Sequence, residues 1–201
     1  MPEKKVGRPR GFDREQALNA AVTVFWEKGY DGTSMRDLTD AMGINSPSLY
    51  SVFGDKQQLF MAAIDHYSQN FGKSPISAFN DETDIKKAII AFLETGITED
   101  DSTPEHPKGC FISSCVPTSA GHVEGATEKL QHIIKGADSL FAARFEEEKS
   151  RGSLPADFPS EERARLMFDL RQGHVLRARA DLPSARIEAD LESRANMILS
   201  Y

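Results

Sequence analysis

Residues 33–56 read TSMRDLTDAMGINSPSLYSVFGDK and contain two short helical patterns separated by a glycine. In the first pattern apolar residues such as Met35 and Leu38 recur at helical spacing, and Gly43 follows as a stop signal. In the second, Pro47 falls at the first helical position, where its fixed φ and missing N–H are tolerated. Two short helices joined by a glycine-containing turn of about three residues predict a helix-turn-helix.

A longer helix is expected on each side of this pair. Residues 13–29 begin with Asp13, a typical N-cap, and carry a wide apolar face up to Gly29, which we expect to end the helix. Residues 55–71 form a second amphipathic pattern whose cap is Asp55. The residues of the second short helix expected to face inward are Leu49, Val52 and Phe53.

The rest of the chain keeps a helical pattern. Residues 98–109 (TEDDSTPEHPKG) read as an acidic, proline-containing loop, and Pro117 limits how much of residues 110–120 one helix can include. No alternation of period two, the pattern of a strand, occurs, so the fold class is all-α. Further helices are predicted at residues 84–97, about 122–150, 160–181 and 184–200.

Composition and charge restrict the class of protein. The chain has 201 residues, 39% hydrophobic and 27% charged, which is typical of a globular protein with a sizeable core. A net charge of −7 argues against indiscriminate binding of nucleic acid. The basic residues are concentrated at the start, since residues 1–14 hold five basic and two acidic residues. Residues 1–12, which also contain glycine and proline, are therefore expected to form a flexible basic arm.

Several sequence features bear on localisation and chemistry. No apolar run approaches the length of a membrane span, and Lys4 and Lys5 are not followed by the apolar stretch of a secretory signal. Cys110 and Cys115 are too few for a disulfide framework and fit a reducing compartment, so a cytoplasmic protein is expected. No G-x-S-x-G, P-loop, H-E-x-x-H or C-x-x-C motif is present. We expect no enzymatic activity and no cofactor.

Residues 7–60, GRPRGFDREQALNAAVTVFWEKGYDGTSMRDLTDAMGINSPSLYSVFGDKQQLF, carry a more specific signal. They closely resemble the TetR/AcrR family of transcriptional regulators in the F-x-x-x-G-[YF]-x-x-[TS]-[ST] and L-Y-x-x-F-x-x-K passages. The resemblance implies a helix-turn-helix DNA-binding domain at residues 13–56 and a helical ligand-sensing and dimerisation domain at residues 57–201. It also implies a homodimeric repressor that binds a quasi-palindromic operator in double-stranded DNA and is released by an unknown small-molecule or thiol-reactive inducer. A helical adaptor that binds another protein through its last helices is the alternative.

The same resemblance identifies candidate DNA-binding residues. Small exposed residues of the recognition helix suit close approach to base edges, tyrosine and lysine suit phosphate, and the basic arm suits an adjacent groove. Thr33 and Ser34 are expected to cap the second helix and to reach phosphate, and Arg36 to reach phosphate or a guanine edge. The full set is Lys5, Arg8, Arg10, Thr33, Ser34, Arg36, Ser46, Pro47, Ser48, Tyr50, Ser51 and Lys56.

A sensing domain needs a cavity or a reactive group, and the chain is rich in phenylalanine, with 12 against one tryptophan. Each of these rings is alternatively an ordinary core residue. The two cysteines have three interpretations: small buried hydrophobes, the default; a sensor of oxidants or electrophiles with Lys108 or His106 as the nearby cation; or a soft-metal site of His106, Cys110 and His122. The candidate pocket residues are Ile64, Tyr67, Phe71, Phe92, Cys110, Phe111, Phe141, Phe145 and Phe168.

The last two predicted helices carry apolar seams that exceed what one protomer's core is expected to need. Packed against their copies around a two-fold axis, they would form a four-helix interface, with Gly173 permitting a close crossing. The expected interface residues are Leu166, Leu170, Gly173, Leu176, Ile187, Leu191 and Ile198.

Overall fold

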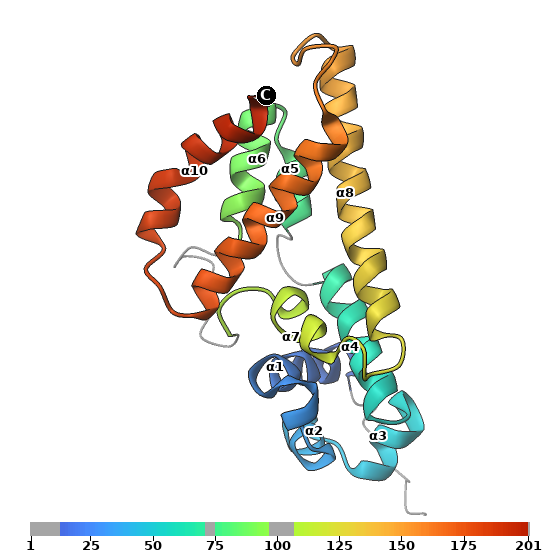
Figure 1. Ribbon diagram of the computed structural model, residues 1–201. Helices are drawn as coiled ribbons and strands as arrows, with labels where there is room; N and C mark the ends of the chain where they lie inside the picture. Colours follow the sequence, from blue (N-terminus) through green and yellow to red (C-terminus); the bar gives the residue numbers. More distant parts are fainter. Residues whose placement is uncertain (1–12, 71–74, 97–106, 201) are drawn as a thin grey trace, which may run out of the picture.

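The computed structural model describes residues 13–70, 75–96 and 107–200, and within these ranges the chain is entirely helical (Figure 1). None of the described helices is long and apolar enough to cross a membrane. The helices are α1 (Arg14–Gly32), α2 (Met35–Met42), α3 (Ser46–Phe53), α4 (Lys56–Asn70), α5 (Pro75–Asp81), α6 (Ile85–Glu94), α7 (Phe111–Ser119), α8 (Ala126–Ser150), α9 (Ser160–Arg179) and α10 (Ala185–Leu199). The all-α fold expected from the sequence is confirmed.

The first helix is held at both ends by local signals. The Asp13 carboxylate accepts hydrogen bonds from the backbone N–H groups of Glu15 and Gln16, which satisfies donors that a helix start leaves free. At the other end the helical conformation breaks at Gly29, whose φ of 72° and ψ of 170° are accessible to almost no other residue. The chain resumes for one short turn before α2. Gly29 therefore does interrupt the helix, as the sequence predicts.

One apolar cluster joins the first four helices to α7 and the start of α8. The buried rings of Phe25, Phe60 and Phe111 meet in it, with centroids of Phe25 and Phe60 5.0 Å apart. Leu49 and Phe53 are the buried residues of α3. In Figure 1, α4 runs from the α1–α3 unit up to the upper helices. Hydrophobic contacts thus cross the domain boundary placed after residue 56.

A second apolar cluster is formed by α5, α6, α8, α9 and α10. Within it, α9 supplies donors to the carbonyl groups at the end of α6. Arg171 donates to the carbonyls of Phe92 (2.7 Å) and Thr95 (2.8 Å), and His174 Nδ1 donates to that of Leu93 (3.0 Å). Since helix ends leave carbonyls without helical donors, these bonds fix α6 against α9.

Four details of the fold differ from the sequence prediction. Helix α5 was not anticipated, and α8 begins four residues later than expected. Pro117 lies inside α7 rather than dividing residues 110–120. Val52 does not face inward: it is 44% exposed, because a two-turn helix buries only the stripe that carries Leu49 and Phe53.

Replacing Gly29 by alanine tests the importance of the break in α1. We expect Gly29→Ala to lower the free energy of unfolding by about 1–3 kcal/mol, because nothing lies within 4 Å of an added Cβ and only the backbone conformation is strained. Gly136→Ala in α8 is the matched control, since its Cβ also meets nothing, and it should raise stability by up to about 1 kcal/mol. Urea unfolding at one protein concentration measures both, and equal effects would contradict the argument.

The buried histidine of α9 predicts a pH dependence of stability. Burial, with the nearby charges of Arg194, Arg171 and Arg177, lowers the pKa of His174 below its ordinary 6.5. The unfolded chain therefore takes up the proton first, so this stability is complete above about pH 6.5 and declines as the pH falls toward the folded-state pKa. His174→Asn, which keeps a donor for the Leu93 carbonyl, should flatten the decline in unfolding free energy between pH 7.5 and 5.5.

The decline should not vanish entirely, because burial lowers the pKa of His66 as well. His132→Asn is the control for this measurement, since His132 is exposed on α8. An unchanged pH slope in His174→Asn would contradict the prediction.

Candidate nucleic-acid interface

The start of α2 is fixed by a network that links it to α1. Ser34 is its N-cap: the Ser34 hydroxyl accepts from the Asp37 N–H, and an Asp37 carboxylate oxygen accepts from the Ser34 N–H. Lys28 of α1 lies 2.5 Å from the Asp37 carboxylate. Lys28, and then the Ser34 hydroxyl, hold the pKa of Asp37 well below its usual range. The Lys28–Asp37 pair therefore ties α1 to the start of α2.

Helix α3 presents small polar residues to solvent on the face opposite Leu49 and Phe53. Asn45 is the N-cap, and its side-chain oxygen accepts from the Ser48 N–H at 2.9 Å. Ser46, Pro47 and Ser51 are exposed, and Ser48 is half-buried. Small side chains allow a helix to approach base edges closely in a major groove, where serine can donate or accept.

Two groups suited to phosphate flank this face. Tyr50 is 53% exposed on α3. At the start of α4, the Asp55 carboxylate accepts from the Gln58 N–H, and the Gln58 side chain accepts from the Asp55 N–H. Lys56 Nζ lies 4.4 Å from the centroid of the Tyr30 ring, a cation–π contact that orients the ammonium group.

Two of the expected contacts on α2 have different environments. The Arg36 side chain is 88% exposed, and its pair with Asp40 at 3.6 Å is a weak surface interaction, so the guanidinium remains available. Thr33 is buried, and its hydroxyl donates to the Gly29 carbonyl, so the expectation that it caps α2 and reaches phosphate is wrong. The local sequence could not show that the neighbouring turn buries Thr33.

The predicted contacts on the arm, Lys5, Arg8 and Arg10, lie outside the described residues, as does Phe71 of the predicted pocket. The sequence did not identify Val52 as a candidate DNA-binding residue, although its side chain is exposed on α3. Its assignment to the core followed from its apolar character and the spacing from Leu49.

The apolar residues predicted to line one pocket are divided between the two apolar clusters. Ile64, Tyr67 and Phe111 belong to the first, and Phe92, Phe141, Phe145 and Phe168 to the second. Several of the rings pack against one another, as in the 4.5 Å separation of the Phe92 and Phe141 centroids. The structure therefore does not bring the set together.

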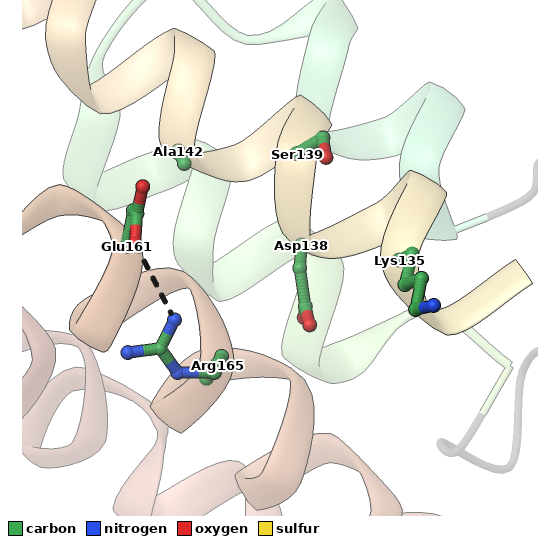
Figure 2. Close-up of a pocket in the computed structure, with 6 residues that line it drawn as sticks. All are labelled: Lys135, Asp138, Ser139, Ala142, Glu161 and Arg165. Atoms are coloured by element: carbon green, nitrogen blue, oxygen red, sulfur yellow. Dashed lines mark ion pairs between the residues drawn. The ribbon is translucent and has the colours of Figure 1, made fainter. Parts of the chain in front are cut away.

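An open cleft of about 330 Å³ lies instead between α8 and α9, where Figure 2 shows Asp138 and Ser139 on α8 and the pair Glu161–Arg165 on α9. One Asp138 carboxylate oxygen is buried without a hydrogen-bond partner among the described residues. Burial raises the pKa of Asp138. The cleft combines charges of both signs, since Lys135 also lines it.

The cysteines occupy different environments at α7. Cys110 is half-buried and precedes the helix, whereas Cys115 is buried and its thiol donates to the Phe25 carbonyl at 3.2 Å. Burial raises the pKa of Cys115 to about 11, so the unreactive thiol predominates at neutral pH. Lys108, the cation expected to activate a cysteine, pairs with Asp181 at 2.6 Å.

The proposed soft-metal site is not assembled in the described part of the chain. No group of three or more metal-ligating side chains occurs there, and His106 lies outside it. His122 instead lies 2.9 Å from the Asp31 carboxylate.

The predicted interface residues divide by helix. On α9, Leu176 is 71% exposed, Gly173 is exposed, and Leu166 and Leu170 are half-buried. On α10, Ile187, Leu191 and Ile198 are buried within the chain's own second cluster, so the expectation that they face a partner is wrong. The physical reason is that α6 covers this seam.

Comparisons with known proteins agree with the geometry of α1–α4. The model of the family described as "Bacterial regulatory proteins, tetR family" matches residues 17–63. The chain is 31% identical over 180 residues to the HTH-type transcriptional repressor ComR of Escherichia coli strain K12, covering 88% of this chain and 84% of ComR. It is 27% identical over 170 residues to the repressor BdcR of the same organism, covering 85% of each chain.

A solved structure is similar over almost the whole length. A cysteine mutant of the TetR family transcriptional regulator CifR, complexed with 26-base-pair double-strand operator DNA, superposes with a TM-score of 0.84. The two sequences are 31% identical, and the match covers 94% of this chain and 98% of that one.

The cap of α3 gives a prediction about stability. Asn45→Ala leaves the Ser48 N–H without its acceptor and should lower the free energy of unfolding by about 0.5–2 kcal/mol. Asn45→Asp, which keeps an acceptor oxygen, is the control and should stay near the wild-type value. Urea unfolding followed by circular dichroism compares them, and an Asn45→Ala protein as stable as the aspartate variant would contradict the prediction.

Proposed function

The chain belongs to the TetR family and is a DNA-binding transcriptional regulator, and we propose that it is a repressor that binds a quasi-palindromic operator as a homodimer. A small-molecule inducer releases it from the operator. The observation that carries the proposal is the α3 surface: small residues and Tyr50 are exposed on it, while Leu49 and Phe53 anchor the helix. ComR and BdcR, named as repressors, support the direction of regulation.

In the proposed complex, different residues attract the DNA backbone and recognise the base sequence. Ser46, Pro47, Ser48 and Ser51 approach base edges, while Tyr50, Lys56 and the N-terminus of α4 hold phosphates. The serines and proline lack the bidentate donors of arginine or asparagine, so Arg36 and DNA shape contribute more of the discrimination. The basic residues of the arm, Lys5, Arg8 and Arg10, add attraction that depends on salt.

The proposed dimer uses the outer faces of α9 and α10. Leu176 and Met197, together with Leu182 in the turn between the helices, are the large apolar side chains exposed on this part of the described chain. Gly173 on the same side of α9 permits a close helix crossing. Two α3 helices placed by a two-fold axis must enter successive major grooves about 34 Å apart, so a small change in their separation loses one half-site.

We propose that release from the operator depends on the first apolar cluster, to which α4 belongs. Because α4 belongs to both the DNA-binding unit and the first apolar cluster, a ligand that favours a shifted α4 moves α3. A coupling free energy of about 1–3 kcal/mol changes operator affinity about 5- to 150-fold.

The charge on Lys56 predicts a change in the salt dependence of binding. With an operator selected by the protein from random DNA, Lys56→Gln should weaken binding and reduce the slope of log K against log[salt] by about 1 per subunit. Tyr50→Phe should weaken binding without changing this slope, since it removes a hydroxyl and no charge.

Lys87→Gln, which changes an exposed lysine of α6, is the control and should leave both affinity and slope unchanged. Fluorescence anisotropy at several salt concentrations measures these quantities. A slope unaffected by Lys56→Gln would show that Lys56 does not contact phosphate. Failure to select any specific DNA would contradict the proposed function.

A further inference from the structure

A second cleft, of about 240 Å³, lies between α7 and α9 and is lined by both apolar and hydrogen-bonding groups. Ser113 and Ser114 of α7 face Gln172 and Arg179 of α9 across it. The apolar part of its lining comes from Val175 and Leu176 on α9.

Arg179 brings an uncompensated charge to this cleft. On the same helix Arg163 and Arg165 each lie 3.8 Å from a glutamate, but no carboxylate of the described residues lies within 4.0 Å of the Arg179 guanidinium. Its one hydrogen bond within the described part of the chain is from Nη2 to the Trp26 carbonyl, at 2.9 Å. A guanidinium has five N–H donors, so several remain for a ligand.

The neighbouring side chains also retain hydrogen-bonding capacity. Within the described ranges, the hydroxyls of Ser113 and Ser114 and the amide of Gln172 make no side-chain hydrogen bond. A guanidinium with two hydroxyls and an amide is a set of donors suited to a carboxylate. The cleft is smaller than the roughly 300–1,000 Å³ of sites for drug-sized ligands, so its ligand must be small.

We propose that this cleft binds a small carboxylate with a short alkyl chain, whose carboxylate pairs with Arg179 and whose chain lies against Val175. This proposal rests on the proposed function in one respect, because it identifies the inducer as a small carboxylate. The site of the inducer then lies outside the phenylalanine-lined pocket expected from the sequence.

The position of Arg179 links the cleft to the DNA-binding unit. Its hydrogen bond reaches the last turn of α1 before the break at Gly29, where the Cys115 thiol also donates to the Phe25 carbonyl. A carboxylate that binds the remaining N–H groups draws the guanidinium into the cleft, away from the Trp26 carbonyl. The end of α1 then loses a tether to α9, and the Lys28–Asp37 pair carries the displacement to α2.

Calorimetry of the full chain tests the binding step without DNA. Sodium acetate, butanoate and hexanoate are titrated at constant ionic strength, with butanamide as the uncharged analogue and inorganic phosphate as an anion without an alkyl chain. Butanoate is expected to bind, with at least tenfold weaker binding of butanamide and of phosphate. Failure of all three carboxylates to bind, or binding of phosphate as tight as that of butanoate, overturns the proposal.

Variants of the cleft residues test whether butanoate binds in this cleft. Arg179→Gln should weaken butanoate binding at least tenfold, Arg179→Lys should weaken it less, and Arg165→Gln, on the same helix at the other cleft, should leave it unchanged. Thermal unfolding verifies that each variant is folded, and Ser113→Ala with Ser114→Ala gives a second route to the site if Arg179→Gln does not fold. Butanoate binding that none of the cleft variants weakens also overturns the proposal.

The coupling step uses the operator selected for the preceding experiments. Butanoate at ten times its dissociation constant should lower operator affinity of the wild-type protein at least fivefold, and should not change that of Arg179→Gln. If no specific operator can be selected, the proposed function fails while the calorimetry still decides the ligand site. If butanoate binds at Arg179 and operator affinity stays the same, the assignment of the ligand as inducer is overturned.

Discussion

Burial of the apolar face of α1 is the interaction on which the rest of the structure depends. Phe25 is fully buried there, and its ring meets that of Phe60 from α4 while its carbonyl accepts the Cys115 thiol of α7. A fully buried aromatic ring contributes several kilocalories per mole, so α2, α3, α4 and α7 cannot keep their positions without this surface. The DNA-binding unit is therefore joined to α7 and α8 through one apolar core.

Two helix ends show how polar groups make this packing specific. The α6 carbonyls accept from Arg171 and His174 of α9, and the α1 carbonyls accept from Cys115 of α7 and Arg179 of α9. Apolar contact is non-directional, whereas a hydrogen bond to an end carbonyl requires one position of the donor. Helix α9 thus holds both α6 and the end of α1.

The neutral recognition helix is consistent with this arrangement. Its exposed serines are short, which suits close approach to a groove, and the charges that we propose attract DNA lie on Lys56 and Arg36. The orientation of these charges depends on contacts made outside α3, such as the ring of Tyr30 beneath Lys56. In the proposed complex, specificity and attraction are therefore carried by different elements.

The sequence alone determined the helix-turn-helix, because its signals are local: Asn45 and Ser34 cap helices, Gly43 and Gly54 end them, and Leu49 and Phe53 recur at helical spacing. It also indicated the family and the exposure of Ser46, Pro47, Tyr50 and Ser51 on α3. Only the tertiary structure decided that Thr33 and the seam of Ile187, Leu191 and Ile198 are buried, that Val52 is exposed, and that the phenylalanines belong to two clusters. These outcomes depend on which distant helix covers a surface, as in the bond between Arg179 and Trp26, 153 residues apart. Local periodicity shows that a face is apolar, but the partner that buries it is set by the packing of the whole chain.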